Sequence, residues 1–156
     1  MRGSNRLAAI AAAALLAAVG AHAAAPDSAQ IIKDRQATMK QQGAAMGKVK
    51  AFLEGKGDIA AAQKGGADLK ETMDKIPSLF PPGTDTASPD GKYRPKPAIW
   101  SSWNEFLSVR DTAANKTQVL IAALDGGDKA KIQAAFGDLG KNGCGACHDK
   151  FREKLQ

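Results

Sequence analysis

The sequence predicts an all-α protein, an antiparallel four-helix bundle with one long loop between its second and third helices. Apolar residues recur at intervals of three, four or seven in four separate stretches, which is the pattern of helices that bury one face. The first and last connections between these stretches are short, and short connections place neighbouring helices antiparallel. Alternation typical of strands is almost absent.

The first 23 residues have the features of a secretory signal peptide. Arg2 and Arg6 give the positive start, residues 7–19 are an apolar run of mostly Ala and Leu, and Ala21-His22-Ala23 provides an A-x-A cleavage site. The run is short for a membrane span and no second one follows, so we expect no stable span after cleavage. The alternative is that the segment is retained as an N-terminal anchor. Residues 24–156 are then one exported domain, and a bacterial periplasm is its expected location.

The charge balance is moderately basic, with 22 Lys and Arg against 16 Asp and Glu. The signal peptide removes two of the arginines, and the remaining charges are scattered along the chain. This distribution is typical of solvated helix faces, and together with export it argues against a nucleic-acid partner.

The first predicted helix begins at Asp27, which can form a capping box with Gln30 after Pro26. Gly43 lies one turn after Met39. It either leaves room for a bulky group beside that side chain or is a tolerated or kinked glycine. The apolar face of this helix is made by Ile32, Met39, Met46, Val49 and Leu53.

The second predicted helix follows Gly55 and Gly57, is capped by Asp58, and stops at Pro77. A passage of about 20 residues, rich in Gly, Pro, Ser and Asp, then leads to Pro97, which is long for a loop in a compact domain. We expect apolar and aromatic side chains to pack this loop against the helices, namely Leu79, Phe80 and Tyr93.

The third predicted helix starts at Pro97 and ends at Gly126 and Gly127. It contains both tryptophans, Trp100 and Trp103, which we assign to packing because Trp at helical spacing is usually a core residue.

The fourth predicted helix is capped by Asp128 and continues to Leu155. Three glycines, Gly137, Gly140 and Gly143, precede its last turns and are expected to let a flat group approach the backbone. Its expected inner face comprises Ile132, Phe136, Leu139, Cys144, Cys147, His148, Phe151 and Leu155.

The sequence Cys144-Gly145-Ala146-Cys147-His148 is the C-x-x-C-H attachment signature of a c-type haem. Positions i, i+3 and i+4 share one face of a helix, so both thiols and the imidazole point towards the same ring. The thiols would form thioethers with the haem vinyl groups, and His148 would bind the iron. One haem c and its iron are therefore the expected cofactor.

Three other uses of these residues are possible. A thioredoxin-like redox pair normally opens a helix after a strand, and no such unit is predicted. A structural zinc site needs four Cys or His ligands, whereas the chain has two of each type and His22 leaves with the signal peptide. A plain disulfide would leave His148 without a role.

With this motif at the C-terminus of four helices, the chain resembles class II c-type cytochromes, the cytochrome c prime family. The resemblance covers residues 27–155 and includes Arg35-Gln36, Pro97-Ala98-Ile99-Trp100, and the segments 134–138 and 147–152. It implies haem contacts from Arg35 and Gln36. It also implies that Met39 faces the open side of the iron, as in the low-spin branch where a Met is the sixth ligand, although some high-spin members carry an unbonded Met there.

The residues themselves give partial support to Met39. No second His remains in the mature chain, and a Lys ligand would have to lose its proton, which leaves the thioethers of Met39, Met46 and Met73. Arg35 lies one turn before Met39, and an inward Arg would need an anion such as a haem propionate. The alternatives are a Met that fills the core and an Arg that snorkels to the surface.

Three functions were compared on this basis. The first expectation is an electron carrier with a low-spin His148/Met39 haem, which exchanges electrons with periplasmic redox proteins and performs no enzymatic reaction. The alternative is a high-spin haem protein that binds nitric oxide or carbon monoxide. A peroxidase-like enzyme is disfavoured because no distal His or carboxylate pair is evident. The resemblance also makes a homodimer possible.

Overall fold

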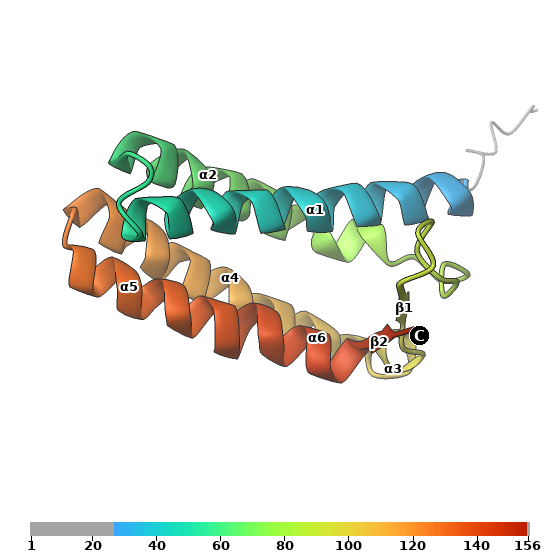
Figure 1. The fold of residues 1–156 in the computed structure, drawn as a ribbon. Coiled ribbons are helices and arrows are strands. Elements are labelled where there is room, and N and C mark those ends of the chain that lie inside the picture. Colours follow the sequence, from blue (N-terminus) through green and yellow to red (C-terminus); the bar gives the residue numbers. More distant parts are fainter. Residues whose placement is uncertain (1–26, 156) are drawn as a thin grey trace, which may run out of the picture.

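The computed structural model describes residues 27–155, and the predicted signal peptide lies outside the described residues. The long helices are α1 (Ser28–Leu53), α2 (Ile59–Lys75), α4 (Trp103–Gly126) and a C-terminal helix in three parts, α5 (Lys129–Asp138), η2 (Leu139–Gly145) and α6 (Ala146–Phe151). Figure 1 shows them packed side by side as a bundle whose successive members run in opposite directions. The predicted antiparallel four-helix bundle is confirmed.

The helix starts follow the predicted caps. The carboxylates of Asp27, Asp58 and Asp128 accept hydrogen bonds from backbone amides of the first turns of α1, α2 and α5. These bonds satisfy donors that a helix start leaves free. The predicted capping box is wrong in one detail, because Gln30 donates to Asp34 at 2.8 Å instead of returning to Asp27.

The predicted third helix is interrupted near its start. A short helix α3 (Ala98–Ser101) precedes α4, and Ser102 between them has φ −130° and ψ 48°, outside the helical region. Before the long loop, Pro77 lies inside a 3-10 turn, η1 (Ile76–Leu79), that follows α2. Both tryptophans pack against aromatic core residues, as expected.

The C-terminal helix differs from the prediction in two ways. Its segment η2 is π-helical, and a π-helix often marks a functional site. The helix also ends at Phe151 instead of Leu155. Strand β2 (Arg152–Lys154) follows and pairs antiparallel with β1 (Tyr93–Pro95) of the long loop. The ribbon exists because the loop and the C-terminus meet in space, which local sequence patterns do not reveal.

The buried core falls into two clusters along the bundle. The aliphatic cluster occupies the end where α1 turns into α2, and the aromatic cluster occupies the end that carries the long loop. The aliphatic cluster comprises Ala45, Val49, Ala62, Leu69, Leu120, Leu124, Ile132, Ala135 and Leu139. The aromatic cluster comprises Met73, Ile76, Leu79, Phe80, Ile99, Phe106, Ala113 and Phe151.

Candidate haem site

A cavity of about 330 Å³ lies within the end of the bundle that holds the aromatic cluster. Residues of α1, α2, α4, the C-terminal helix and the long loop form its wall. Its volume is within the range of small-molecule sites, roughly 300–1,000 Å³. Cys144, Cys147 and His148 all line this cavity, so the three residues of the motif face one common space.

Burial of the motif sets the protonation states of its three side chains. Both cysteines are free thiols, and burial raises the pKa of Cys144 and raises the pKa of Cys147 to about 11. Burial, aided by nearby Arg152, lowers the pKa of His148 to about 4. The imidazole is therefore neutral at pH 7, which is the form that binds a metal.

The rest of the wall is largely apolar and aromatic. Phe106 is central, with its ring centroid 5.0 Å from that of Phe80 and 5.3 Å from that of Phe151. Met73, Ile76 and Ile99 also belong to both the aromatic cluster and the cavity wall. A flat apolar macrocycle fits such a wall.

Two polar atoms in the cavity wall lack partners. Gln42 Nε2 and Arg110 Nε are the buried side-chain nitrogens or oxygens of residues 27–155 without a hydrogen bond, and both residues line the cavity. An unsatisfied buried donor costs about 1–3 kcal/mol. Both atoms are donors, so they indicate that the cavity is completed by a group with acceptor atoms.

The charged residues of the cavity wall are mostly cations. They are Arg35, Lys40, Arg94, Arg110 and Arg152, against the single carboxylate of Asp90. A haem carries two propionates, so this excess of positive charge suits it. The thiols, the neutral imidazole, the apolar wall and the donors therefore fit a covalently attached haem.

Arg35 lies on this wall but is bonded to the long loop. Its three nitrogens donate to Leu79 and Thr84, its side chain is buried, and burial lowers its pKa to about 10, so it stays charged at neutral pH. This is not the exposed, snorkelling arginine weighed as an alternative. The predicted contact between Arg35 and a propionate stays a prediction, as does the role of Gln36, which lines the same cavity.

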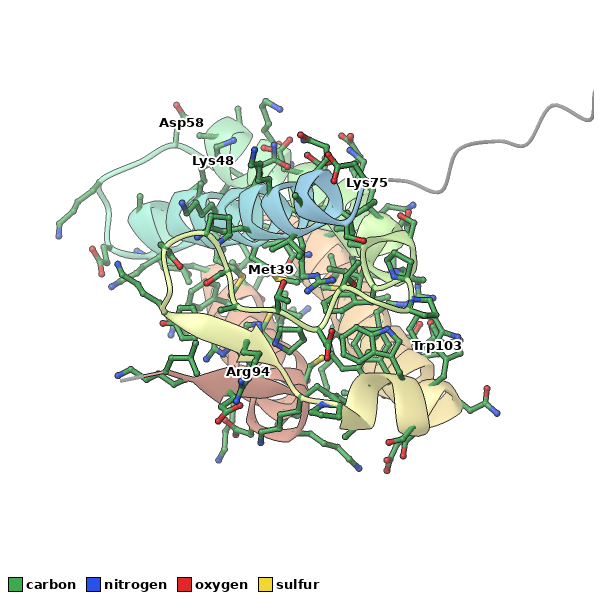
Figure 2. The ribbon with its side chains drawn as sticks, turned by 90° about the vertical axis from the view of Figure 1, so that its right-hand side faces the viewer. Met39, Lys48, Asp58, Lys75, Arg94 and Trp103 are labelled. Carbon is green, nitrogen blue, oxygen red and sulfur yellow. The ribbon has the colours of Figure 1, made fainter. Side chains whose placement is uncertain are left out.

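Met39 is half-buried and lines the cavity, and Figure 2 shows it between α1 and the C-terminal helix. Met46 packs against the aliphatic cluster and does not line the cavity. Met73 also lines the cavity, at 5% exposure, so position alone leaves two thioethers beside the site. Ligation of the iron by Met39 stays a prediction.

The glycines that were expected beside a bulky or flat group lie outside the cavity wall. Gly43 is exposed, and none of Gly43, Gly137, Gly140 and Gly143 lines the cavity. A Cβ at Gly143 would lie 2.9 Å from Leu139 Cδ1 and 3.4 Å from Ala113 Cα. This glycine therefore allows close packing against α4 and does not make room for a flat group.

The sequence did not lead us to place several residues in the cavity wall. Gln42 follows Met39 by three residues and Arg110 follows Phe106 by four, so helical spacing places each on the face of a predicted core residue. That spacing could have predicted that both residues lie in the cavity wall. Helical spacing could not predict the position of Arg152. Its Cζ lies 4.6 Å from the centroid of the Tyr93 ring, and this contact depends on the β1–β2 ribbon.

Comparison with known proteins extends this picture. The family model described as Cytochrome C' matches residues 30–152. The chain belongs to the cytochrome c' family. Members of this family are haem proteins, not enzymes, carry one covalently attached haem c, and are typically periplasmic.

The relatives include proteins with two different names. A cytochrome c' from Rubrivivax gelatinosus is 40% identical over 111 residues, which cover 69% of this chain and 82% of that protein. A cytochrome c-556 from Agrobacterium tumefaciens is 31% identical over 125 residues, 79% of this chain and 97% of the relative. Sequence similarity thus places the chain in the family without resolving the branch.

The solved structures that are similar to this chain include cytochromes c'. One, described as having an unusual ligand-controlled dimer dissociation, has a TM-score of 0.76 and 29% identity, and the match covers 84% of this chain and 100% of that one. A nitric oxide complex of a cytochrome c' variant from Alcaligenes xylosoxidans has a TM-score of 0.73 and 28% identity, covering 84% and 99%. Some members are therefore dimers. Within residues 27–155, no helix is long and apolar enough to cross a membrane.

Proposed function

We propose that this protein is a periplasmic haem c protein that binds nitric oxide or carbon monoxide. The haem is attached through Cys144 and Cys147, His148 binds the iron, and the small ligand occupies the side of the cavity lined by Met39 and Gln42. When bound, the haem supplies an iron centre with a coordination position for a diatomic molecule. The residues of the chain hold it, shield it from solvent and provide hydrogen bonds.

The observation that carries this proposal is the unpartnered amide of Gln42. It lies three residues after Met39 on α1, in the wall of the cavity that also contains His148. In an iron site closed by a thioether, this N–H donor would have only the acceptor atoms of the haem as partners. A bound diatomic molecule offers an acceptor atom. The structural relatives support the same function, because they include complexes of cytochrome c' variants with nitric oxide and with carbon monoxide.

The electron carrier, which the sequence analysis placed first, is the second candidate. It is favoured by the position of Met39, which lines the same cavity as His148 but comes from a different helix. A His148/Met39 pair would close the iron to added ligands and leave electron exchange with another periplasmic redox protein as the function. The comparisons support this candidate less than gas binding.

The absorption and electron paramagnetic resonance spectra of the purified protein near neutral pH separate the two functions. We expect high-spin ferric iron and ready binding of carbon monoxide by the ferrous protein. Low-spin iron in both oxidation states, with no binding of carbon monoxide, would overturn the gas-binding proposal and establish the electron carrier in its place.

A further inference from the structure

Arg35 connects α1 to the long loop through a buried set of hydrogen bonds. Its Nε donates to the Leu79 carbonyl at 2.9 Å, Nη1 to the Thr84 carbonyl at 2.9 Å, and Nη2 to Thr84 Oγ1 at 2.5 Å. Arg35 is 7% exposed, and these partners include no carboxylate. A buried guanidinium that bonds uncharged acceptors keeps its geometry only while the loop supplies them.

Neighbouring contacts hold the same part of the loop. Arg35 Cζ lies 4.2 Å from the centroid of the Phe80 ring, a favourable cation–π distance. The Phe80 carbonyl accepts from Trp100 Nε1 at 2.9 Å, and the Thr84 hydroxyl donates to the Pro81 carbonyl at 2.8 Å. Residues 79–84 are thus fixed to α1 and α3 together.

The loop that begins here forms one side of the cavity. Its other end is held by the β1–β2 ribbon and by the Arg94–Glu153 ion pair at 2.7 Å. The second attachment is exposed, because both partners of the ion pair are more than 40% exposed, whereas Arg35 is buried. The loop contributes seven residues to the cavity wall: Phe80, Thr86, Ser88, Asp90, Tyr93, Arg94 and Pro95.

We propose that Arg35 is a positioning residue that holds the loop over the cavity and thereby limits the entry of solvent and small molecules. The term Arg35–Thr84 clamp is used for its bonds to residues 79–84. This role concerns the loop and is separate from any contact with a propionate. The clamp itself needs no haem, whereas its effect on ligand entry rests on the proposed function.

Three variants test the clamp: Arg35→Lys, Thr84→Val and the double variant. Lysine keeps the charge but cannot reproduce the planar fork of donors. Valine matches the shape of threonine and removes only the hydroxyl. Thr117→Val is the matched control, because Thr117 is also 1% exposed, bonds to the Ala113 carbonyl within α4 and does not line the cavity.

The first measurement is hydrogen–deuterium exchange of a peptide covering residues 80–92 in the purified protein. Loss of a buried charge-assisted bond raises the population of the open loop by about tenfold or more, and exchange follows that population. We expect about tenfold faster exchange for Arg35→Lys and a few-fold increase for Thr84→Val. For the double variant, the increase in exchange rate should be smaller than the product of the two single increases, because the two residues share one interaction. Thr117→Val should match wild type.

The second measurement is the association rate of carbon monoxide with the ferrous protein, which should rise in the same order. Unchanged loop exchange in both single variants would overturn the proposal. So would faster association of carbon monoxide with Arg35→Lys without faster loop exchange, because Arg35 would then act on the haem and not on the loop. Faster loop exchange in a protein that binds no carbon monoxide in any form would support the clamp and refute the proposed function.

Discussion

The two ends of the bundle are packed in different ways. In the aliphatic cluster the helices approach closely: a Cβ at Gly65 would lie 2.7 Å from the Ala45 carbonyl, and Val49, Leu69 and Leu120 are fully buried. At the other end the same helices surround a cavity of about 330 Å³ whose wall contains two unpartnered buried nitrogens. The chain completes the first region with its own side chains, and the second region requires a bound group.

This comparison assigns stability and function to different parts of one fold. Apolar burial in the aliphatic cluster stabilises the bundle whether or not a cofactor is present. The aromatic cluster surrounds the cavity and gains its remaining contacts only when the haem is attached. Substitutions at the two ends should therefore have separable effects, which the following predictions test from the largest effect to the smallest.

Removing both cysteines of the C-x-x-C-H motif should have the largest effect. Cys144→Ala with Cys147→Ala should abolish haem that stays with the chain on a denaturing gel, because no thioether can form. The aromatic end should then lose amide protection in hydrogen exchange, while amides around Val49 and Leu69 keep more of theirs. Haem that remains bound after denaturation would contradict the attachment through Cys144 and Cys147.

Leu69→Ala should destabilise the protein without altering the haem. Leu69 is fully buried in the aliphatic cluster, and such truncations cost about 2–5 kcal/mol of unfolding free energy. Denaturant unfolding measures this loss, and the absorption spectrum should match wild type. Val119→Ala is the control, because Val119 is 60% exposed and its truncation should cost less than about 0.5 kcal/mol. A changed spectrum in Leu69→Ala would show that the two ends are coupled.

Met39→Ala should change the behaviour of the haem more than the stability. The substitution enlarges the cavity on the side where we propose that the small ligand binds. We expect carbon monoxide to associate about tenfold faster, which corresponds to about 1.4 kcal/mol in the barrier. Flash photolysis of the ferrous complex measures the rate. Met46→Ala is the control, because Met46 packs against the aliphatic cluster. Equal association rates in the two variants would show that Met39 does not lie on the side of the cavity where the small ligand binds.

Gln42→Leu should have the smallest effect, confined to the bound ligand. Loss of one hydrogen bond of about 0.5–1.5 kcal/mol should speed nitric oxide release by two- to tenfold and move the stretching vibration of bound carbon monoxide to higher frequency. Infrared and stopped-flow measurements test both. Gln41→Leu is the matched control, because Gln41 is exposed and lines a different, polar pocket between α1 and α2. Identical spectra for the two variants would show that Gln42 donates to no ligand.

The sequence by itself determined the helices, their caps and the attachment motif. Helical periodicity, the aspartates at positions 27, 58 and 128, and the C-x-x-C-H spacing are local properties, and local properties can be read along the chain. Their consequences are present in the structure: four long helices, capped starts, and three motif residues that face one cavity.

Only the tertiary structure decided which residues surround that motif. The β1–β2 ribbon, the Arg35–Thr84 clamp and the unpartnered amide of Gln42 depend on which segments meet, and those segments are separated by tens of residues in the chain. Gly143 illustrates the same limit, because its close approach to Ala113 of α4 could not be read from the sequence. A residue type shows which contacts are possible, and packing among distant segments selects one of them.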